Sequence, residues 1–428
     1  MRILHTADWH LGHRLYDRDR TEEHRAALAW LLDLVVRENI DLVIVAGDVF
    51  DVSNPSNQAK KLYYDFLAGL QDCNCAAAVI VGGNHDSPSL LDAPADLLRT
   101  NELHVVGAAR SRVRDQLIRA RVGEAEGRTE VLIAAVPYLR EQDLRRGSYG
   151  ESHEDRLTAL RTGIQGHYEA IAQAAADLRD DPTTPIIATG HLFASGAEDN
   201  EGKVSHIYQA DEHNIEAGRF PAVFDYVALG HVHRAQSVDG NAHVRYSGSL
   251  VPLTFVEGQQ PRSVRIVEVG KAGEEVKSHS VYVPYHRTLL RLRGDLETVK
   301  AKLTAATVEF LEGADWAERP RPWAEVRVLS EAPIPNLRRV LEDHLATVEG
   351  DAAGQAIEIL RLSRDNPTPV STEERLARRT RRLDELDPAD VFTDLLDRSG
   401  HADEDRKQLL AEFAALRNYC QEQDPAAT

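Results

Sequence analysis

The sequence predicts an α/β fold built around a layered sheet, and two patterns in the first 240 residues predict it. Six short apolar runs recur there without polar alternation, which is typical of strands buried on both faces. Helix-like stretches with apolar residues three or four positions apart lie between several runs, for example at 22–39 and 57–72. The runs are RILHTAD, DLVIVAGD, AAVIVGGNHD, EVLIAAVP, PIIATGH and YVALGHVH. Strands that alternate with helices over short connections indicate a layered α/β sheet.

After about residue 284 the pattern becomes that of a small α+β unit. Strand-like runs alternate there with helical stretches and contain few candidate metal ligands. Strands are expected at 288–294, 324–330 and 356–362, and helices at 296–313 and 336–349. We therefore predict a first domain over residues 1–283 and an α+β capping domain over 284–363.

A linker and a helical pair are predicted at the end of the sequence. The stretch SRDNPTPVST has two prolines and predicts a linker over 364–372. Residues 373–428 are polar, with a thin apolar stripe at helical spacing: Val391, Phe392, Leu395, Leu396, Leu409, Leu410, Phe413 and Leu416. Two short helices bury too little surface to be stable alone. They pack on their own domain or on a partner protein, and the intervening linker favours the partner.

The composition is typical of a folded protein of the cytoplasm. Of the 428 residues, 42% are hydrophobic and 28% charged, as in ordinary globular domains. No apolar run approaches the roughly 18 to 20 residues that span a membrane. The chain also enters a strand pattern at once, so we expect no leader and no membrane association. The three cysteines, Cys73, Cys75 and Cys420, are too few for a disulfide framework and indicate a reducing compartment.

The net charge of −19 limits how the protein could use nucleic acid. It argues against a protein that coats DNA through its overall field, but it does not exclude DNA as a substrate. A local basic surface, metal ions or a basic partner could supply the attraction. Phosphate contacts or plain solvation are both open for Arg14, Arg18, Arg20, Arg110, Arg112, Arg114 and the run RLARRTRR at 375–382.

Polar side chains gather where five of the six apolar runs end, the usual position of sites in open α/β sheets. They are Asp8 and His10 in ADWHLG, Asp48 in AGDVFD, Asn84 and His85 in GGNHD, His191 in TGH, and His231 and His233 in LGHVH. Oxygen and imidazole donors without thiolate suit manganese, iron or zinc. A single Asp-x-His or His-x-His arises readily by chance, whereas the whole ordered set does not.

Seven of these residues, all except His85, are about what two divalent ions need if one carboxylate bridges them. Asp48 is the natural bridge, since it is the only carboxylate at the end of DLVIVAGD. Two divalent ions carry four positive charges, and the carboxylates of Asp8 and Asp48 supply two negative charges. The site therefore keeps a net positive charge. A positive two-metal site suits phosphate and activates water at neutral pH.

Glycines precede several of the candidate ligands: Gly47, Gly82, Gly83, Gly190 and Gly230. A missing Cβ lets the backbone turn sharply and approach a metal ion or a phosphate closely. Any one of these glycines could serve a simple turn, but the group predicts close approach.

The ordered motifs DxH, GDxxD, GNHD, GH and GHxH resemble the calcineurin-like metallophosphoesterase signature. The variants DWHLG, GDVFD, GGNHD and LGHVH resemble those of the bacterial SbcD family, the nuclease subunits that act with the SMC-like ATPase SbcC. The motifs cover about residues 1 to 255. The α+β unit and the helical tail match the family in layout only.

The resemblance implies which residues hold each ion. One ion would take Asp8, His10, Asp48 and His233, and the other Asp48, Asn84, His191 and His231. His85 would be no ligand but would contact the scissile phosphate or protonate the leaving oxygen, as suits imidazole near neutral pH.

Asp51 departs from part of the family, because archaeal relatives have a histidine three residues after the bridging aspartate. A carboxylate at this position could orient and charge His85, forming a catalytic dyad. Asp86 is a competing partner for His85, and a solvated loop aspartate is the simpler interpretation of Asp51.

The resemblance also implies an activity and partners. The activity would be manganese-dependent 3′-to-5′ exonuclease cleavage of double-stranded DNA in repair, recombination and replication. With SbcC, ATP-dependent endonuclease cleavage of hairpins and blocked ends would follow; this chain has no Walker A motif of its own. A homodimer would form through helices like those at 57–72 and 90–100. There, Leu62, Tyr63, Phe66 and Leu67 could line the dimer surface or face their own sheet.

Two rival functions remain at this point. A phosphatase or cyclic-nucleotide phosphodiesterase would use the same chemistry but needs no appended α+β unit or tail. A metal-free scaffold in a repair complex is a rival of another class, which the complete ligand set opposes.

Overall fold

The computed structural model describes residues 1–73, 75–123, 129–144, 151–195, 214–216, 219–313, 318–349, 356–366, 392, 396 and 408–414. The chain forms two compact units. The first comprises residues 1–329 and 333–364, and the second residues 330–332 and 365–428. The domain boundaries expected from the sequence stay predictions.

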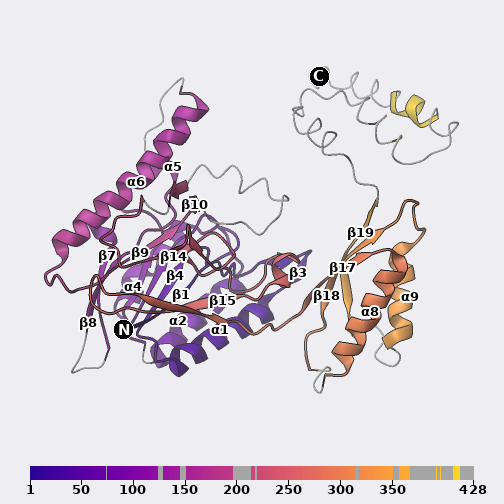
Figure 1. Ribbon diagram of the computed structural model, residues 1–428, viewed down its shortest axis with the longest axis horizontal. Coiled ribbons are helices and arrows are strands. Elements are labelled where there is room, and N and C mark those ends of the chain that lie inside the picture. The colour runs from indigo at the N-terminus through magenta and orange to yellow at the C-terminus, as the bar shows by residue number, and fades with distance from the viewer. Residues whose placement is uncertain are drawn as a thin grey trace. The chain divides into compact units, whose positions relative to one another are not determined.

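The first sheet has the strand order β16-β15-β1-β4-β5-β6. Its parallel strands are β1 (Arg2–Thr6), β4 (Leu42–Ala46), β5 (Ala77–Val81) and β6 (Leu103–Val106). Strand β15 (Ser263–Glu268) pairs antiparallel with β1 on one side and with β16 (Lys277–Tyr282) on the other. Helices α1 (Thr21–Arg37) and α2 (Asn57–Asp72) pack their apolar faces on the outside of this sheet (Figure 1).

The second sheet has the order β13-β14-β12-β9-β8-β7. Its strands are β7 (Leu117–Val122), β8 (Thr129–Ala134), β9 (Ile186–His191), β12 (Tyr226–Gly230), β13 (Gln236–Val238) and β14 (Asn241–Tyr246). The four central strands are parallel and the two edge strands antiparallel. Helix α6 (His153–Leu178) covers the outer face, where Ile164, Tyr168 and Ile171 enter the core.

The two sheets pack face to face. Ile44 and Val79 of the first sheet share one buried cluster with Ile133, Ile187 and Ala228 of the second. The central strands therefore face apolar neighbours on both sides, which is why their sequences lack polar alternation. The predicted layered α/β fold is confirmed, and the six apolar runs form β1, β4, β5, β8, β9 and β12.

Short elements decorate the connections between the strands. They are β2 (Arg14–Leu15), β3 (Arg18–Asp19), α3 (Pro88–Asp92), α4 (Ala95–Arg99), η1 (Val113–Gln116), α5 (Glu141–Leu144), β10 (Phe193–Ser195), β11 (Asn214–Glu216) and η3 (Glu257–Gln259).

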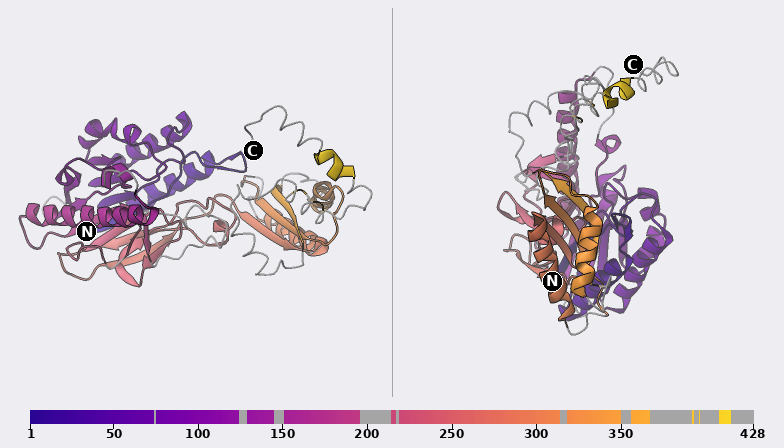
Figure 2. Two further views of the ribbon diagram at one scale, coloured as in Figure 1. Left: turned by 90° about the horizontal axis from the view of Figure 1, so that it is seen from above. Right: turned by 90° about the vertical axis from the view of Figure 1, so that its right-hand side faces the viewer.

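The predicted α+β unit is present with its expected elements. They are β17 (Leu289–Gly294), α8 (Leu296–Leu311), β18 (Trp323–Leu329), α9 (Leu337–Glu349) and β19 (Glu358–Asp365). The strands form one sheet in the order β17-β18-β19. Helices α8 and α9 lie together against one face of it, around a small core that includes Val299, Val326 and Leu341 (Figure 2). The other face carries Leu289 and Trp323, which lie in a buried cluster with Leu15 and Phe255, and charged side chains such as Arg291 and Glu325.

The tail lies largely outside the described residues, as do positions 367–372 of the predicted linker and the run RLARRTRR. Two described members of the apolar stripe, Phe392 and Phe413, stack with ring centroids 4.1 Å apart. Over the part of the chain that is described, no helix has both the length and the apolarity that crossing a membrane requires.

Candidate metal centre

The seven predicted ligands follow strands of both sheets. They are Asp8 and His10 after β1, Asp48 after β4, Asn84 after β5, His191 at the end of β9, and His231 and His233 after β12. Because the two sheets pack face to face with these strand ends at one edge, residues far apart in sequence meet there. The structure brings all seven together.

One group of donors surrounds Asn84. Its Oδ1 atom lies 3.0 Å from His191 Nε2 and 3.0 Å from His231 Nδ1. Asp48 Oδ2 lies 3.2 Å from the same His191 nitrogen and 3.6 Å from His10 Nε2. Asp48 therefore stands between this group and a second one, as a bridging carboxylate must.

The second group consists of Asp8, His10 and His233, whose donor atoms lie within 4.8 Å of one another. Asp8 Oδ1 accepts a hydrogen bond from the His231 backbone N–H at 2.9 Å. Asp8 Oδ2 and His10 Nε2 are buried and have no hydrogen-bond partner among the described residues. Buried polar atoms are rarely left unpaired. A divalent cation would satisfy both atoms, so the residues fit a metal ion.

Neighbouring oxygen atoms orient three of the imidazoles. The Nδ1 atom of His10 is 3.2 Å from Asp51 Oδ1, and that of His191 is 2.9 Å from the carbonyl oxygen of Ala46. The Nδ1 atom of His233 is 3.2 Å from Glu257 Oε1. An Nδ1–H that donates to oxygen leaves Nε2 with the lone pair that a metal ion needs.

Four of the proposed ligands have an uncommon backbone conformation. Their φ angles are positive: 51° at Asp8, 48° at His10, 49° at Asp48 and 96° at His231. Non-glycine residues adopt such angles rarely, and they concentrate at functional sites. Backbone hydrogen bonds hold the turns, since Asp8 N–H donates to Gly47 O and His10 N–H to Asp48 O, each at 3.0 Å.

Two glycines permit the close approach expected from the sequence. A Cβ on Gly47, which has φ of +91°, would lie 2.2 Å from His191 Nδ1. A Cβ on Gly83 would lie 2.1 Å from Asp48 Oδ1. Any side chain at either position would displace a proposed ligand.

Charge interactions in the centre oppose the effect of burial. Burial lowers the pKa of a histidine, yet Asp48 raises the pKa of His191 to about 9, and Glu257 raises the pKa of His233 to about 9. Burial would raise the pKa of Asp48, but His191 and His10 hold that pKa far below its usual value. In the metal-free protein both histidines are therefore protonated near neutral pH, and metal binding must release these protons.

Asp51 does not make the contact with His85 that the sequence suggested. Its carboxylate faces His10, whereas His85 Nδ1 lies 2.7 Å from the backbone carbonyl oxygen of Asp51. The carboxylate–imidazole dyad stays a prediction: the main chain of Asp51 orients His85, its side chain orients a proposed ligand, and the donor atoms of His10, Asp51 and His85 lie within 4.8 Å of one another. Nδ1–H of His85 donates to the carbonyl, which leaves Nε2 available as an acceptor.

Asp86, the competing partner, stabilises the loop instead. Its carboxylate accepts hydrogen bonds from the backbone N–H groups of Val49, Phe50 and Gly83 at 3.1, 2.9 and 2.8 Å. Burial and the nearby charge of Asp48 raise the pKa of Asp86 to about 6. This residue ties the GGNHD loop to the turn after β4.

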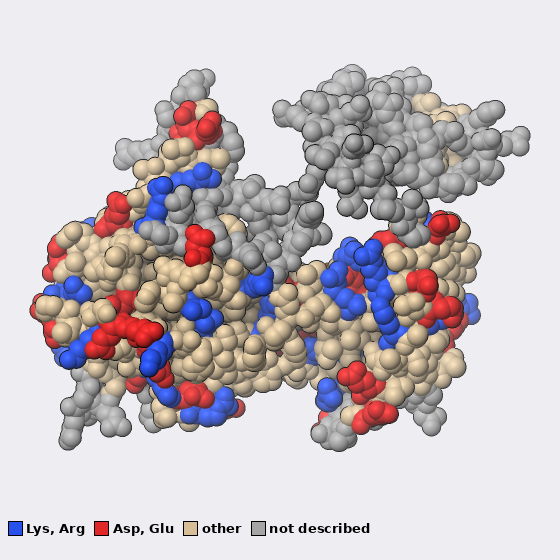
Figure 3. All heavy atoms as spheres, in the orientation of Figure 1, with Lys and Arg blue, Asp and Glu red and all other residues tan. Residues whose placement is uncertain are grey.

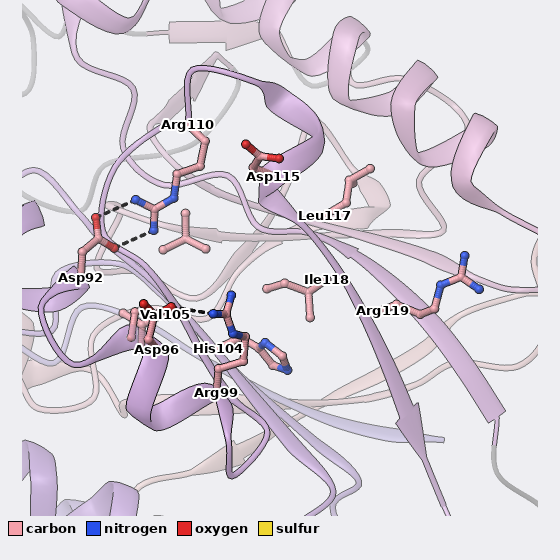
Figure 4. Close-up of a pocket in the computed structure, with 12 residues that line it drawn as sticks. Asp92, Asp96, Arg99, His104, Val105, Arg110, Asp115, Leu117, Ile118 and Arg119 are labelled. Carbon is pink, nitrogen blue, oxygen red and sulfur yellow. Dashed lines mark hydrogen bonds and ion pairs between the residues drawn. The ribbon is translucent and has the colours of Figure 1, made fainter.

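Five of the arginines considered for phosphate contacts have partners in the structure. Arg18 pairs with Glu358, Arg112 pairs with Asp115, and Arg14 donates to the carbonyl oxygen of Asp17. Arg20 is only 1% exposed and pairs with Glu23. Arg110 donates two hydrogen bonds to Asp92, at 2.9 and 2.8 Å, in a cavity of about 500 Å³ beside β6 and β7 (Figure 4). Asp92 also accepts from the backbone N–H of Gly107, so this ion pair fixes the loop after β6.

The apolar residues of α2 face their own sheet. Leu62, Tyr63, Phe66 and Leu67 are at most 5% exposed and belong to the core under the first sheet. Of the two interpretations open from the sequence, the structure supports the internal one for these four side chains.

Glu257 was missed by the sequence analysis. No motif marks it, and it contacts His233 only because the chain returns to the centre after β14. Its burial, at 4% exposed, shows only in the folded chain, so the sequence offered no signal for it.

Family models match most of the chain. The calcineurin-like phosphoesterase model matches residues 1–235. The model described as the type 5 capsule protein repressor C-terminal domain matches residues 286–399. With its layered fold and its centre at the strand ends, the chain is a calcineurin-like phosphoesterase.

Comparison with curated relatives identifies the family within the calcineurin-like phosphoesterases. The SbcD subunit of the SbcCD nuclease from Escherichia coli strain K12 is 34% identical over 80% of this chain and 81% of its own. The SbcD protein of Rhodobacter capsulatus is 35% identical over 83% and 87%, and that of Bacillus subtilis is 31% identical over 80% and 83%. The chain belongs to the SbcD nuclease family, as the sequence motifs indicated.

Proposed function

We propose that the protein is a manganese-dependent nuclease that hydrolyses phosphodiester bonds of double-stranded DNA from the 3′ end. The observation that carries the proposal is that seven side chains with oxygen and nitrogen donors meet at one edge of the sheets. Two of the donor atoms, Asp8 Oδ2 and His10 Nε2, are buried without a hydrogen-bond partner among the described residues. Relatives named as nuclease subunits identify the substrate class as nucleic acid.

The ligand groups in the structure support two ion positions. Asp8, His10 and His233 with Asp48 would hold one ion, and Asn84, His191 and His231 with Asp48 the other. Bound divalent ions supply a nucleophile from water and neutralise charge on the phosphate. Manganese suits this mixed set of carboxylate, amide and imidazole ligands.

His85 is proposed as the residue that acts on the scissile phosphate. Its imidazole lies edge-on to His10, with ring centroids 4.9 Å apart, so it stands beside the centre. With Nδ1–H held by the Asp51 carbonyl, its Nε2 can carry the proton that the leaving oxygen needs. Asp51 is proposed to position His10 through its carboxylate and His85 through its main chain.

Three arginines on the face of the α+β sheet opposite α8 and α9 supply a basic surface for DNA, and one of them, Arg361, also donates to the Tyr16 hydroxyl at 2.8 Å. Arg291, Arg327 and Arg361 surround the buried carboxylate of Glu325 at 2.8, 3.3 and 3.0 Å. One negative charge cannot neutralise three guanidinium groups, each with five N–H donors. Figure 3 shows Lys and Arg side chains gathered over this unit. We call Arg291, Arg327 and Arg361 the arginine cluster and propose that it contacts the DNA backbone.

Replacing Arg291 and Arg361 together with glutamine should weaken duplex DNA binding and leave hydrolysis of a small phosphodiester unchanged. If each arginine neutralises one phosphate, the slope of log affinity against log salt should fall by about 2. The measurement is fluorescence anisotropy of labelled duplex at several salt concentrations. Arg339→Gln, an exposed α9 residue paired with Asp343, is the matched control. An unchanged salt slope in the double variant would remove the cluster from the DNA surface.

The proposal includes partners. The relatives are subunits of the SbcCD complex, so we propose an SbcC-type SMC-like ATPase as partner, bound through residues 373–428. With this ATPase the chain would cleave hairpins and blocked ends in an ATP-dependent manner. A homodimer and a cytoplasmic, nucleoid-associated location belong to the same proposal.

Digestion of linear duplex DNA by the purified chain tests the proposed function. With 5′-labelled duplex and manganese, labelled strands should shorten progressively from their 3′ ends, and excess chelator should abolish the reaction. If duplex DNA survives while bis(4-nitrophenyl) phosphate is hydrolysed, the proposed phosphodiester hydrolysis is supported. The proposal that the isolated chain degrades double-stranded DNA then fails. If neither substrate reacts, the proposal fails altogether.

A further inference from the structure

Glu257 lies against a proposed metal ligand with both carboxylate oxygens engaged. Oε1 is 3.2 Å from His233 Nδ1. Oε2 accepts hydrogen bonds from the Ser249 hydroxyl at 3.2 Å and from the Leu253 backbone N–H at 3.0 Å. The side chain is only 4% exposed. These contacts fix the orientation of the Glu257 carboxylate relative to the His233 imidazole.

Arg262 completes a clamp around His233. Its Nη1 atom lies 3.5 Å from Glu257 Oε2 and donates to the backbone carbonyl oxygen of His233 at 2.8 Å. The Ser249 N–H donates to the same carbonyl at 3.1 Å. Glu257 thus fixes the ring of His233 while Arg262 and Ser249 fix its main chain.

The turn that bears Glu257 packs on the α+β unit. Glu257 begins η3, in which Gln259 Nε2 donates to the carbonyl oxygen of Leu289 in β17 at 3.0 Å. A Cβ on Gly258 would lie 2.7 Å from Leu289 Cβ, which shows how closely the two backbones approach. A shift of β17 would therefore move the carboxylate that orients His233.

The same packing reaches the segment that bears the other two ligands of this group. Phe255, just before η3, shares a buried cluster with Leu289 and Trp323 of the α+β sheet and with Leu15. Leu15 lies in β2, five residues after His10. By contrast, His191 in the other donor group is oriented by Ala46 of the first sheet.

We propose that Glu257 is a positioning residue that fixes His233 as an Nε2 donor. Through η3 and β17, it makes one of the two ion positions depend on the packing of the α+β unit. This inference rests on the proposed two-metal function. It predicts unequal ion positions: the one built on Asp8, His10 and His233 responds to changes at Glu257, and the one built on Asn84 does not.

Manganese(II) titration of the full chain, followed by calorimetry and low-temperature electron paramagnetic resonance, tests this proposal. The wild-type chain should bind two ions and show the spectrum of two exchange-coupled ions. Glu257→Gln keeps the shape and removes the charge. It should weaken one position by about 10- to 100-fold, the usual effect of losing a partner of a metal-bound histidine. The spectrum should then change to that of isolated ions. Glu130→Gln, a half-buried glutamate paired with Arg119, should behave as wild type.

Each outcome decides one part of the inference. Two coupled ions with unchanged affinity in Glu257→Gln would overturn the role of Glu257. A wild-type chain that binds fewer than two ions would instead overturn the proposed function. Gln259→Ala, which removes the hydrogen bond to β17, should weaken the same position to a smaller degree; wild-type binding there would overturn the link to the α+β unit. If circular dichroism shows that Glu257→Gln is unfolded, Glu257→Asp, which withdraws the carboxylate from Nδ1, replaces it.

Discussion

Replacing His85 with glutamine should lower kcat on duplex DNA by about 10²- to 10⁴-fold, the usual contribution of a general acid, and should leave metal binding intact. The side chain of His85 hydrogen-bonds to the Asp51 carbonyl and lies edge-on to His10, and it is not one of the seven proposed ligands. Its backbone N–H donates to Asp48 Oδ1 at 2.9 Å, and this contact survives any side-chain substitution. Glutamine retains a polar group but cannot deliver a proton at neutral pH.

The measurement combines single-turnover digestion of end-labelled duplex with the manganese content of the same preparation. His104→Gln, a histidine of β6 paired with Glu102 outside the centre, is the control and should digest DNA at the wild-type rate. Full activity of His85→Gln would remove His85 from the chemistry. Loss of manganese in His85→Gln would make it a ligand, contrary to our assignment.

Replacing Asp48 with asparagine should reduce bound manganese from two ions per chain to one or none and lower kcat/KM on the order of 10³-fold or more. The bridging position needs a charged oxygen for both ions, and Asp48 Oδ2 is the atom near both His191 and His10. Without this charge, Asp8 alone would balance four positive charges. Several kcal/mol of transition-state stabilisation depend on such ions, and each 1.36 kcal/mol is tenfold in rate.

Metal analysis of the dialysed protein and digestion at saturating manganese together measure this effect. Asp65→Asn, an exposed residue paired with Lys61 on α2, serves as the control. An Asp48→Asn chain that still binds two ions would show that another group bridges them. Restored activity at high manganese would limit the role of Asp48 to affinity.

The positions of the proposed ligands could be predicted because local pattern and topology agree. Each follows a buried strand, and such strands expose their ends at one edge of a sheet. Asp8 and His231 are 223 positions apart, yet the meeting of their strand ends was implied once both runs were recognised as core strands.

Other features depend on tertiary packing that a sequence does not encode locally. The apolar stripe of α2 predicts that one face of the helix is buried. It does not predict whether that face packs on a sheet of the same chain or on a second chain. The partner of Asp51 depends on which way a loop side chain turns, so a neighbour in the motif, His85, was chosen over His10. Glu257 lies 24 residues from His233 on a turn without a motif, and only packing on β17 brings it into place.

The placement of the ligands on two facing sheets has a consequence for how long the protein survives in a cell. If an ion binds as proposed, Asp48 and Asn84 from one sheet and His191 and His231 from the other would hold it, and it would cross-link the halves of the core. A ligand that binds only the folded state, at a thousandfold excess over its Kd, adds about 4 kcal/mol to the free energy of unfolding. Withdrawal of manganese would remove this contribution and expose the chain to proteases more often. Metal supply would then set the abundance of the protein as well as its activity.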